Sequence, residues 1–175
     1  MKKLALIAAA VLCTLGTAFG QNNTKRSIAS IENNDDAFEV FAYDEDGVRS
    51  YYLQMRNTGY EVTSAVSLSS DMMELFVYLG SNVNEAAETL KGILALYDAP
   101  IGDYKMYTGR LGGNLPIGAT RDIKAVVQKK LLSKKSQLSF TFQGEQANIV
   151  SWMQKSDAKM LLKFLTSYQK RHPDR

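Results

Sequence analysis

The sequence has one cysteine and one histidine, and their scarcity excludes several kinds of chemistry. Cys13 is the only cysteine in 175 residues, so no disulfide can form within the chain. The only histidine, His172, lies beside Pro173 near the C-terminus. A Ser-His-Asp triad or a histidine-based metal site would have to use that end of the chain. We therefore expect no cofactor, no metal site and no catalytic residues of these classes.

Proline is scarce as well, and two of the three prolines lie in the segment 100–121. Within it, GRLGGNLPIGATRD at 109–122 holds four of the twelve glycines. Gly113 and Gly118 have the spacing of a phosphate-binding loop, but Ala119 replaces the lysine that reaches the phosphates. We therefore interpret the segment as a turn at the rim of a binding surface, with Arg110 and Arg121 as candidate anion contacts.

The N-terminus has the pattern of a cleaved leader. Lys2 and Lys3 precede an apolar run from Leu4 to Ala18, and Gly20 completes a small-residue cleavage site. We expect residues 1–20 to be a bacterial signal peptide cut after Gly20. This predicts a periplasmic or secreted protein with no transmembrane segment after the cut. The alternative is an uncleaved membrane anchor.

Charge is divided unevenly along the chain. Residues 21–123 contain 8 Lys or Arg against 15 Asp or Glu, whereas residues 124–175 contain 11 against 3. Such a division can pair the two halves within one fold, which we expect, or align separate molecules head to tail. An exported chain rarely meets nucleic acid, so we do not expect nucleic acid as a partner.

The chain after residue 20 predicts one α+β domain built on antiparallel strands. Residues 21–36 are polar and lack a sustained period, so we expect a flexible N-terminal segment before a single domain at 37–171. Two β-rich runs flank Asp46-Gly47, which is typical of a tight hairpin. Further alternating runs at 60–68 and 74–79 predict a meander of four strands in sequence order.

Two amphipathic helices complete the predicted domain. Apolar residues at helical spacing predict one helix from about residue 84 and another from about 157 to 171. Four strands also precede the second helix. Residues 37–98 and 104–170 thus share an element order, which suggests two pseudo-repeats of four strands plus one helix. Sparse helices among runs of strands favour an α+β fold over alternating βαβ units.

Aromatic side chains give the sharper binding hypothesis. Strand alternation places several rings opposite the aliphatic face, and an exposed aromatic patch would mark a ligand surface. The candidate ligand-binding residues are Phe41, Tyr43, Tyr52, Phe76, Tyr78, Arg110 and Arg121. The competing interpretation is that the rings pack in the interior.

Together these features predict an exported, non-catalytic binding or interaction module. The expected partner is a saccharide, a cell-wall polymer or another exported protein. One alternative is a carboxylate-dependent hydrolase acting on glycans, for which Glu39 and Glu61 are strand candidates. Another is a structural protein that self-associates through its acidic and basic halves.

Overall fold

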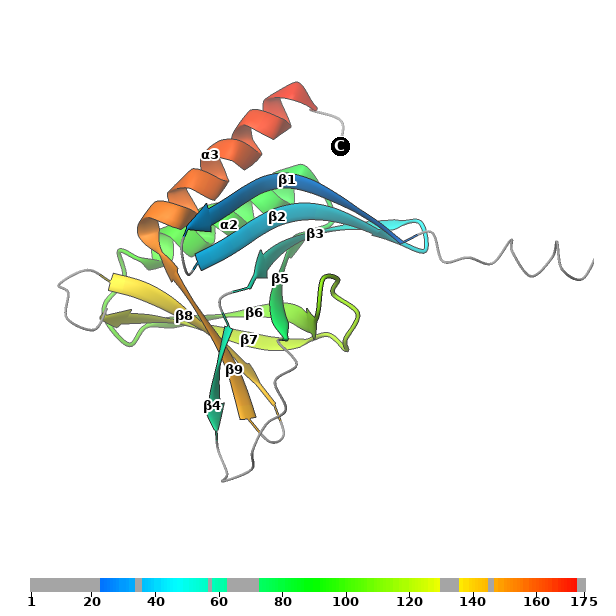
Figure 1. The fold of residues 1–175 in the computed structure, drawn as a ribbon. Coiled ribbons are helices and arrows are strands. Elements are labelled where there is room, and N and C mark those ends of the chain that lie inside the picture. The colour runs from blue at the N-terminus through cyan, green and yellow to red at the C-terminus, as the bar shows by residue number, and fades with distance from the viewer. Residues whose placement is uncertain are drawn as a thin grey trace, which may run out of the picture.

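The computed structural model describes residues 23–33, 36–56, 58–62, 73–129, 136–144 and 147–172. These residues form an α+β fold in which nine antiparallel strands make one curved sheet, a half-barrel, with two helices (Figure 1). The predicted signal peptide lies outside the described residues. The strands are β1 (Thr24–Asn33), β2 (Asp36–Glu45), β3 (Val48–Met55), β4 (Thr58–Val62), β5 (Glu74–Gly80), β6 (Tyr104–Gly112), β7 (Arg121–Lys129), β8 (Ser136–Gln143) and β9 (Ala147–Gln154), and the helices are α2 (Val83–Leu96) and α3 (Lys155–Arg171).

Strands pair in the order β1-β2-β3-β5-β6-β7-β8-β9-β4. The predicted meander is therefore wrong for one strand: β4 follows β3 in the chain but pairs with β9 at the far edge of the sheet. Side-chain packing accounts for that position. A Cβ atom on Gly59 of β4 would lie 3.1 Å from the ring of Trp152 on β9, so the indole covers the glycine directly, as aromatic rings do over glycines at sheet edges.

Residues 21–36 also differ from the prediction of a flexible segment, because most of them form strand β1. β1 pairs with β2, which places Ala29 opposite Val40 and Ile31 opposite Phe38. Both β1 side chains are 5% exposed. On this edge strand only alternate residues, such as Ala29 and Ile31, are buried. The apolar alternation is therefore short and is hard to recognise among the polar residues around it.

The two predicted pseudo-repeats share their element order but not their strand pairing. In residues 104–170, β6 to β9 pair consecutively and α3 follows. In residues 37–98, β3 pairs with β5, and β4 lies elsewhere. An internal duplication therefore stays a prediction.

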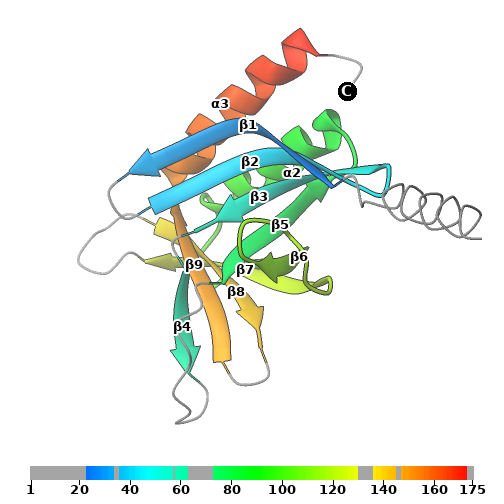
Figure 2. The same cartoon turned by 45° about the vertical axis from the view of Figure 1, so that its right-hand side comes forward.

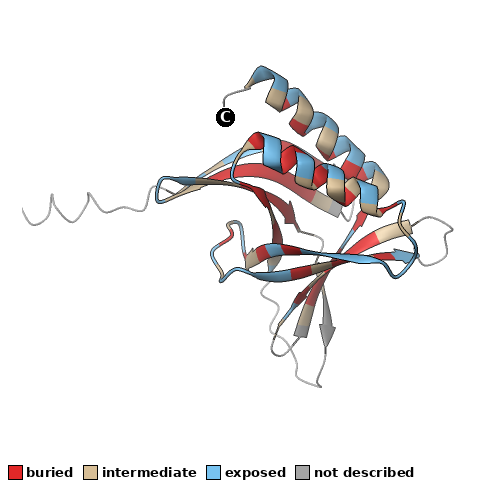
Figure 3. Ribbon diagram, turned by 180° about the vertical axis from the view of Figure 1, so that it is seen from behind, coloured by how far each residue is buried: buried red, intermediate tan, exposed pale blue. Residues whose placement is uncertain are grey.

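Both helices lie on one side of the sheet, over β1, β2, β3 and β5 (Figures 1 and 2). The Asn82 side chain caps α2 by accepting a hydrogen bond from the Glu85 N–H at 2.9 Å. The facing surfaces of helices and strands are buried (Figure 3). We call this side of the sheet the helix-covered face; its strand residues include Val40, Leu53, Leu75, Val77 and Leu79.

Ion pairs between described residues lie mostly within residues 21–123, and the contact of Lys155 with Asp98 crosses to the basic half. Among these ion pairs, the contact of Lys155 with Asp98 joins the acidic and basic halves, as the expected pairing requires. None of the described helices combines the length and apolar character needed to cross a membrane.

Candidate functional site

The face of the sheet away from the helices carries an aromatic cluster on β2, β3 and β5. Its members are Phe41, Tyr43, Tyr52 and Phe76, with Tyr78 at its margin. Strand alternation assigned these rings to the correct face. The expectation of an exposed patch was wrong, because Phe41 and Phe76 are fully buried and Tyr52 is 4% exposed. The competing interpretation, that the rings pack in the interior, holds for the four buried members.

The rings contact one another in the arrangements that aromatic side chains prefer. Phe41 stacks on Tyr52 with ring centroids 5.9 Å apart, and Phe76 meets Phe41 edge-on at 6.0 Å. Tyr52 meets Tyr78 edge-on at 5.7 Å. Such pairs stabilise beyond the area they bury. The cluster is therefore a second hydrophobic core, and Tyr78 is its partly exposed margin.

A charged network continues the same face beyond the rings. Lys25 Nζ lies 4.4 Å from the Phe41 ring centroid and donates to Glu39 and to Gln54, each at 2.6 Å. Arg56 donates to Glu39 at 3.0 Å. Glu39, a candidate acid in the hydrolase alternative, is thus ion-paired with both Lys25 and Arg56. The side chain of Glu61, the other candidate acid, lies outside the described residues.

The glycine-rich segment turns the chain closely over this face, which explains its composition. A Cβ atom on Gly109 would lie 2.3 Å from the Phe76 carbonyl oxygen, and one on Gly112 would lie 1.9 Å from the Leu115 carbonyl oxygen. Neither position has room for a side chain. The tight turn brings Leu115 against the aromatic cluster. The glycines therefore serve close backbone approach, as the turn interpretation requires.

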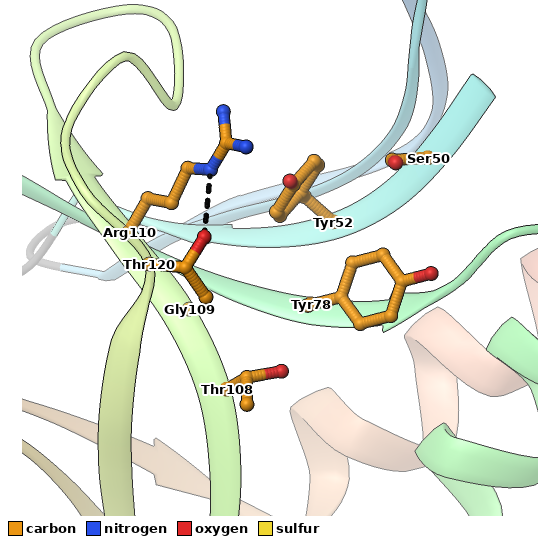
Figure 4. A pocket seen from close by; sticks show the side chains of 7 residues that line it. All are labelled: Ser50, Tyr52, Tyr78, Thr108, Gly109, Arg110 and Thr120. Atoms are coloured by element: carbon orange, nitrogen blue, oxygen red, sulfur yellow. Dashed lines mark hydrogen bonds between the residues drawn. The ribbon is translucent and has the colours of Figure 1, made fainter. Parts of the chain in front are cut away.

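A pocket of about 230 Å³ opens between the cluster and this turn. Tyr52 and Tyr78 present their rings on one side, and Arg110 reaches over from β6 on the other (Figure 4). Hydroxyl groups dominate the remaining polar lining. We call it the ring pocket; its lining residues are Ser50, Tyr52, Tyr78, Thr108, Gly109, Arg110 and Thr120.

Three hydrogen bonds hold Arg110 in place. Its Nη1 donates to Glu45 at 2.9 Å and to the Pro116 carbonyl at 3.0 Å, and its Nε donates to Thr120 at 3.2 Å. Burial is the largest single influence and lowers the pKa of Arg110, but the hydrogen bond to Glu45 and the electrostatic attraction of Glu45, Tyr52 and Tyr43 together leave that pKa raised. Arg110 is thus a fixed, charge-balanced hydrogen-bond donor at the pocket wall.

The pocket tyrosines remain neutral donors over a wide pH range. Burial raises the pKa of Tyr52, and the neighbouring charges of Arg110 and Glu45 act in opposite directions. Burial, assisted by Glu85, also raises the pKa of Tyr78. Both hydroxyls can therefore donate or accept hydrogen bonds at neutral pH.

The structure brings three of the predicted ligand-binding residues to the ring pocket: Tyr52, Tyr78 and Arg110. Phe41, Tyr43 and Phe76 lie behind them in the cluster. Arg121 does not line the pocket: it is exposed and pairs with Gly109, one position along from Arg110 and so on the opposite face.

Sequence reasoning missed three hydroxyl-bearing residues of the ring pocket. Two had a usable signal, because Ser50 lies two residues before Tyr52 and Thr108 two before Arg110, so each pair shares a strand face. Thr120 is brought in by the glycine-rich turn, which no local period predicts. None of the described pocket residues is a carboxylate.

Among the described residues, no group of three or more His, Cys, Asp or Glu side chains is arranged to hold a metal ion. The pocket lining offers hydroxyl and guanidinium groups for hydrogen bonding and tyrosine rings for aromatic contact. Comparison with protein-family models, curated proteins and solved structures finds no match to this chain, so a functional proposal depends on the pocket itself.

Proposed function

We propose that the protein is a binding module whose ring pocket takes one ring of a saccharide. The observation that carries this is the lining: two tyrosine rings, three aliphatic hydroxyls and one fixed guanidinium around a single space. Sugar rings present apolar C–H faces and hydroxyl edges. Aromatic rings suit the faces, and hydroxyl or guanidinium groups suit the edges.

The size of the pocket limits the ligand. Sites for drug-sized molecules measure roughly 300–1,000 Å³, and the ring pocket, at about 230 Å³, is smaller. It suits one sugar ring, with any further rings of a polymer lying outside. Exposed Thr108 and partly exposed Tyr78 border the opening and would meet such an extension first.

The charge state favours a neutral sugar. Arg110 is already paired with Glu45 and bonded to a carbonyl, so its positive charge is largely balanced. A strongly anionic ligand would have to compete with Glu45 for the guanidinium. A neutral hydroxyl needs only a donor in a fixed position, at little entropic cost.

The test is titration of the protein with glucose, galactose, N-acetylglucosamine and glucuronate, followed by calorimetry and by backbone NMR shifts. We expect at least one neutral sugar to bind and to shift signals of Tyr78 and Thr108. Thr108→Val removes one hydroxyl at nearly constant shape and should weaken binding about tenfold, the equivalent of about 1.4 kcal/mol. Tyr78→Ala should abolish it.

Tyr104→Ala is the matched control, because Tyr104 is a 58% exposed tyrosine on the same strand as Thr108 but outside the pocket. It should leave the dissociation constant unchanged. The proposal fails if no neutral sugar binds, or if sugar binding is insensitive to both pocket variants.

We also propose that the protein acts outside the cytoplasm, in the periplasm or secreted, on a cell-wall polymer or an exported glycoconjugate. The support is the leader pattern of residues 1–20. N-terminal sequencing of protein from fractionated cells tests this, with Gln21 as the expected first residue. Recovery of an intact Met1 in the cytoplasmic fraction would contradict it.

A further inference from the structure

The sheet opens along part of the boundary between β5 and β6. The two strands pair at four positions, from Glu74 opposite Gly112 to Val77 opposite Gly109. Beyond that point β5 continues to Gly80, and β6 extends back to Tyr104. Continuing the register would pair Tyr78 with Thr108 and Gly80 with Met106. The ladder ends instead, and β6 remains paired with β7 alone.

The direction of the backbone groups follows from strand alternation. Val127 of β7 donates its N–H to the Asp103 carbonyl at 2.9 Å, so odd-numbered residues from there along β6 direct their N–H and C=O toward β7. Even-numbered residues, including Met106 and Thr108, direct theirs toward β5. By the same rule Tyr78 directs its N–H and C=O toward β6, because Phe76 pairs with Arg110 in the closed part of the ladder. The register of β5 shifts after Tyr78, so the rule does not extend to Gly80.

A groove of about 390 Å³ occupies this opening. Leu79, Gly80 and Tyr107 are among its walls, so the residues that would have continued the ladder line it instead. Helix α2 forms another wall. We call it the seam groove; its lining residues are Tyr78, Leu79, Gly80, Glu85, Glu88, Thr89, Lys105, Tyr107 and Thr108.

Tyr107 supplies a separate sign of a missing partner. It is 7% exposed, and its hydroxyl is a buried group without a hydrogen-bond partner among the described residues. Burial raises its pKa to about 12, so the hydroxyl stays protonated at neutral pH. Buried polar groups are nearly always hydrogen-bonded in native proteins.

We propose that the seam groove binds a short extended peptide carrying a basic side chain, which adds a strand between β5 and β6. Two facing strand edges present alternate N–H and C=O groups, and another extended backbone is the partner that matches both. Glu85 and Glu88 on α2 outnumber Lys105 in the lining. Glu88 also pairs with Lys91, which does not line the groove, at 2.6 Å, so a Lys or Arg of the peptide would share or replace that exposed pair.

Alternation also divides the peptide side chains between two environments. One set would face α2 and its carboxylates, and the other would lie on the side of Tyr78 and Thr108, where the seam groove meets the ring pocket. The inference does not depend on sugar binding, because it follows from the open ladder and the charges of α2.

The first experiment titrates the protein with an acetylated, amidated hexapeptide of alternating valine and lysine, followed by calorimetry. We expect saturable binding, at least tenfold weaker binding when glutamate replaces lysine, and a similar loss when alternate peptide nitrogens are methylated. Methylation removes ladder donors without changing side chains, so it separates backbone pairing from charge attraction.

Amide hydrogen exchange with the bound peptide gives the sharper readout. The N–H groups of Met106 and Thr108 should exchange at least tenfold more slowly, while those of Lys105 and Tyr107, already directed at β7, should not change. A ligand held only by side chains would not produce this alternation. The proposal is overturned if the lysine peptide does not bind, or if it binds without alternating protection.

Charge variants on described surfaces complete the test. Glu88→Gln removes a groove carboxylate and should weaken the lysine peptide several-fold. Asp46→Asn removes the same charge from an exposed position in the turn between β2 and β3, outside the groove, and should have no effect. Equal losses in the two variants would assign the attraction to overall charge and contradict a site in the groove.

Discussion

The two faces of the half-sheet formed by β2, β3 and β5 are both buried, but with different chemistry. Leu53 and Gln54 are neighbours on β3, and both are fully buried. Leu53 packs among aliphatic residues beneath the helices. Gln54 points to the other face, where it accepts a hydrogen bond from Lys25 and donates one to Glu74. The first face is closed by helices, and the second by rings, ion pairs and one glycine-rich turn.

This difference locates the binding surface. The aliphatic face packs beneath two helices, and its energy comes from packing density. The aromatic and charged face must satisfy each polar group individually. It is interrupted at Tyr78, where the ring pocket and the seam groove meet. The ring pocket therefore lies on the face whose burial is less complete, and the seam groove extends from Tyr78 toward α2.

The largest effect should come from the helix-covered face. Leu53→Ala removes a fully buried side chain among Val40, Val77 and other residues of the main core. Large-to-small core changes of this kind cost about 2–5 kcal/mol. Urea unfolding followed by circular dichroism measures the loss. A loss below about 1 kcal/mol would show that the helices do not hold this face tightly.

The charged network should respond next. Glu39→Gln leaves Lys25 and Arg56 without their shared carboxylate. Unpaired buried charges are costly, but Lys25 is 21% exposed and Arg56 35%, so we expect a loss of about 1–3 kcal/mol. Urea unfolding measures this too. Adding Lys25→Met should recover part of the loss, and failure to recover any would show that Lys25 is not coupled to Glu39.

The edge of the aromatic cluster permits a gain rather than a loss. The hydroxyl of Tyr43 is buried without a hydrogen-bond partner among the described residues, and its side chain is 1% exposed. Tyr43→Phe removes the unsatisfied group and keeps the ring. We expect unchanged stability or an increase of up to about 1 kcal/mol in thermal unfolding. A clear loss would mean that the hydroxyl is bonded to water.

The comparison of faces also shows how far the sequence could be interpreted. Alternation along each strand is local, so it assigned the aromatic rings to one face and the aliphatic residues to the other. The Asp46-Gly47 hairpin is local too, and both residues have positive φ, 51° and 82°, as a two-residue turn of this kind requires. Local signals therefore predicted most of the elements and which face their side chains share, but not strand β1.

What the sequence could not predict depends on contacts distant along the chain. β4 leaves its neighbours for β9, where Trp152 covers Gly59, and nothing near residue 59 encodes that partner. The aromatic rings are buried partly because Leu115, more than thirty residues away, packs on them. The ring pocket combines Ser50, Thr108 and Thr120 from three separate segments. Its lining is therefore set by the folded sheet and not by any one stretch of sequence.

The smallest effect should come from the hairpin end of the helix-covered face, where the partly exposed ion pair of Asp44 and Arg49 lies on the same side of β2 as Val40 and Ala42. Arg49 donates to the Asp44 carboxylate at 2.7 and 2.9 Å, and this bond lowers the pKa of Asp44 below 3.8. A lowered pKa contributes stability that is present above the unfolded-state value and is lost as pH falls through the folded-state value.

We therefore expect Asp44→Asn to reduce the free energy of unfolding by about 0.5–1 kcal/mol at pH 7, the range of exposed pairs with good geometry. The difference from the wild type should shrink as pH falls below the ordinary Asp44 value of 3.8, because the wild-type carboxylate is then protonated too. Urea unfolding at pH 7, 5 and 3 measures this, with Asp103→Asn, which changes an exposed carboxylate, as the control. A difference that stays constant down to pH 3 would show that Asp44 acts through the shape of its side chain, so that packing rather than charge would provide stability at this end of the helix-covered face as well.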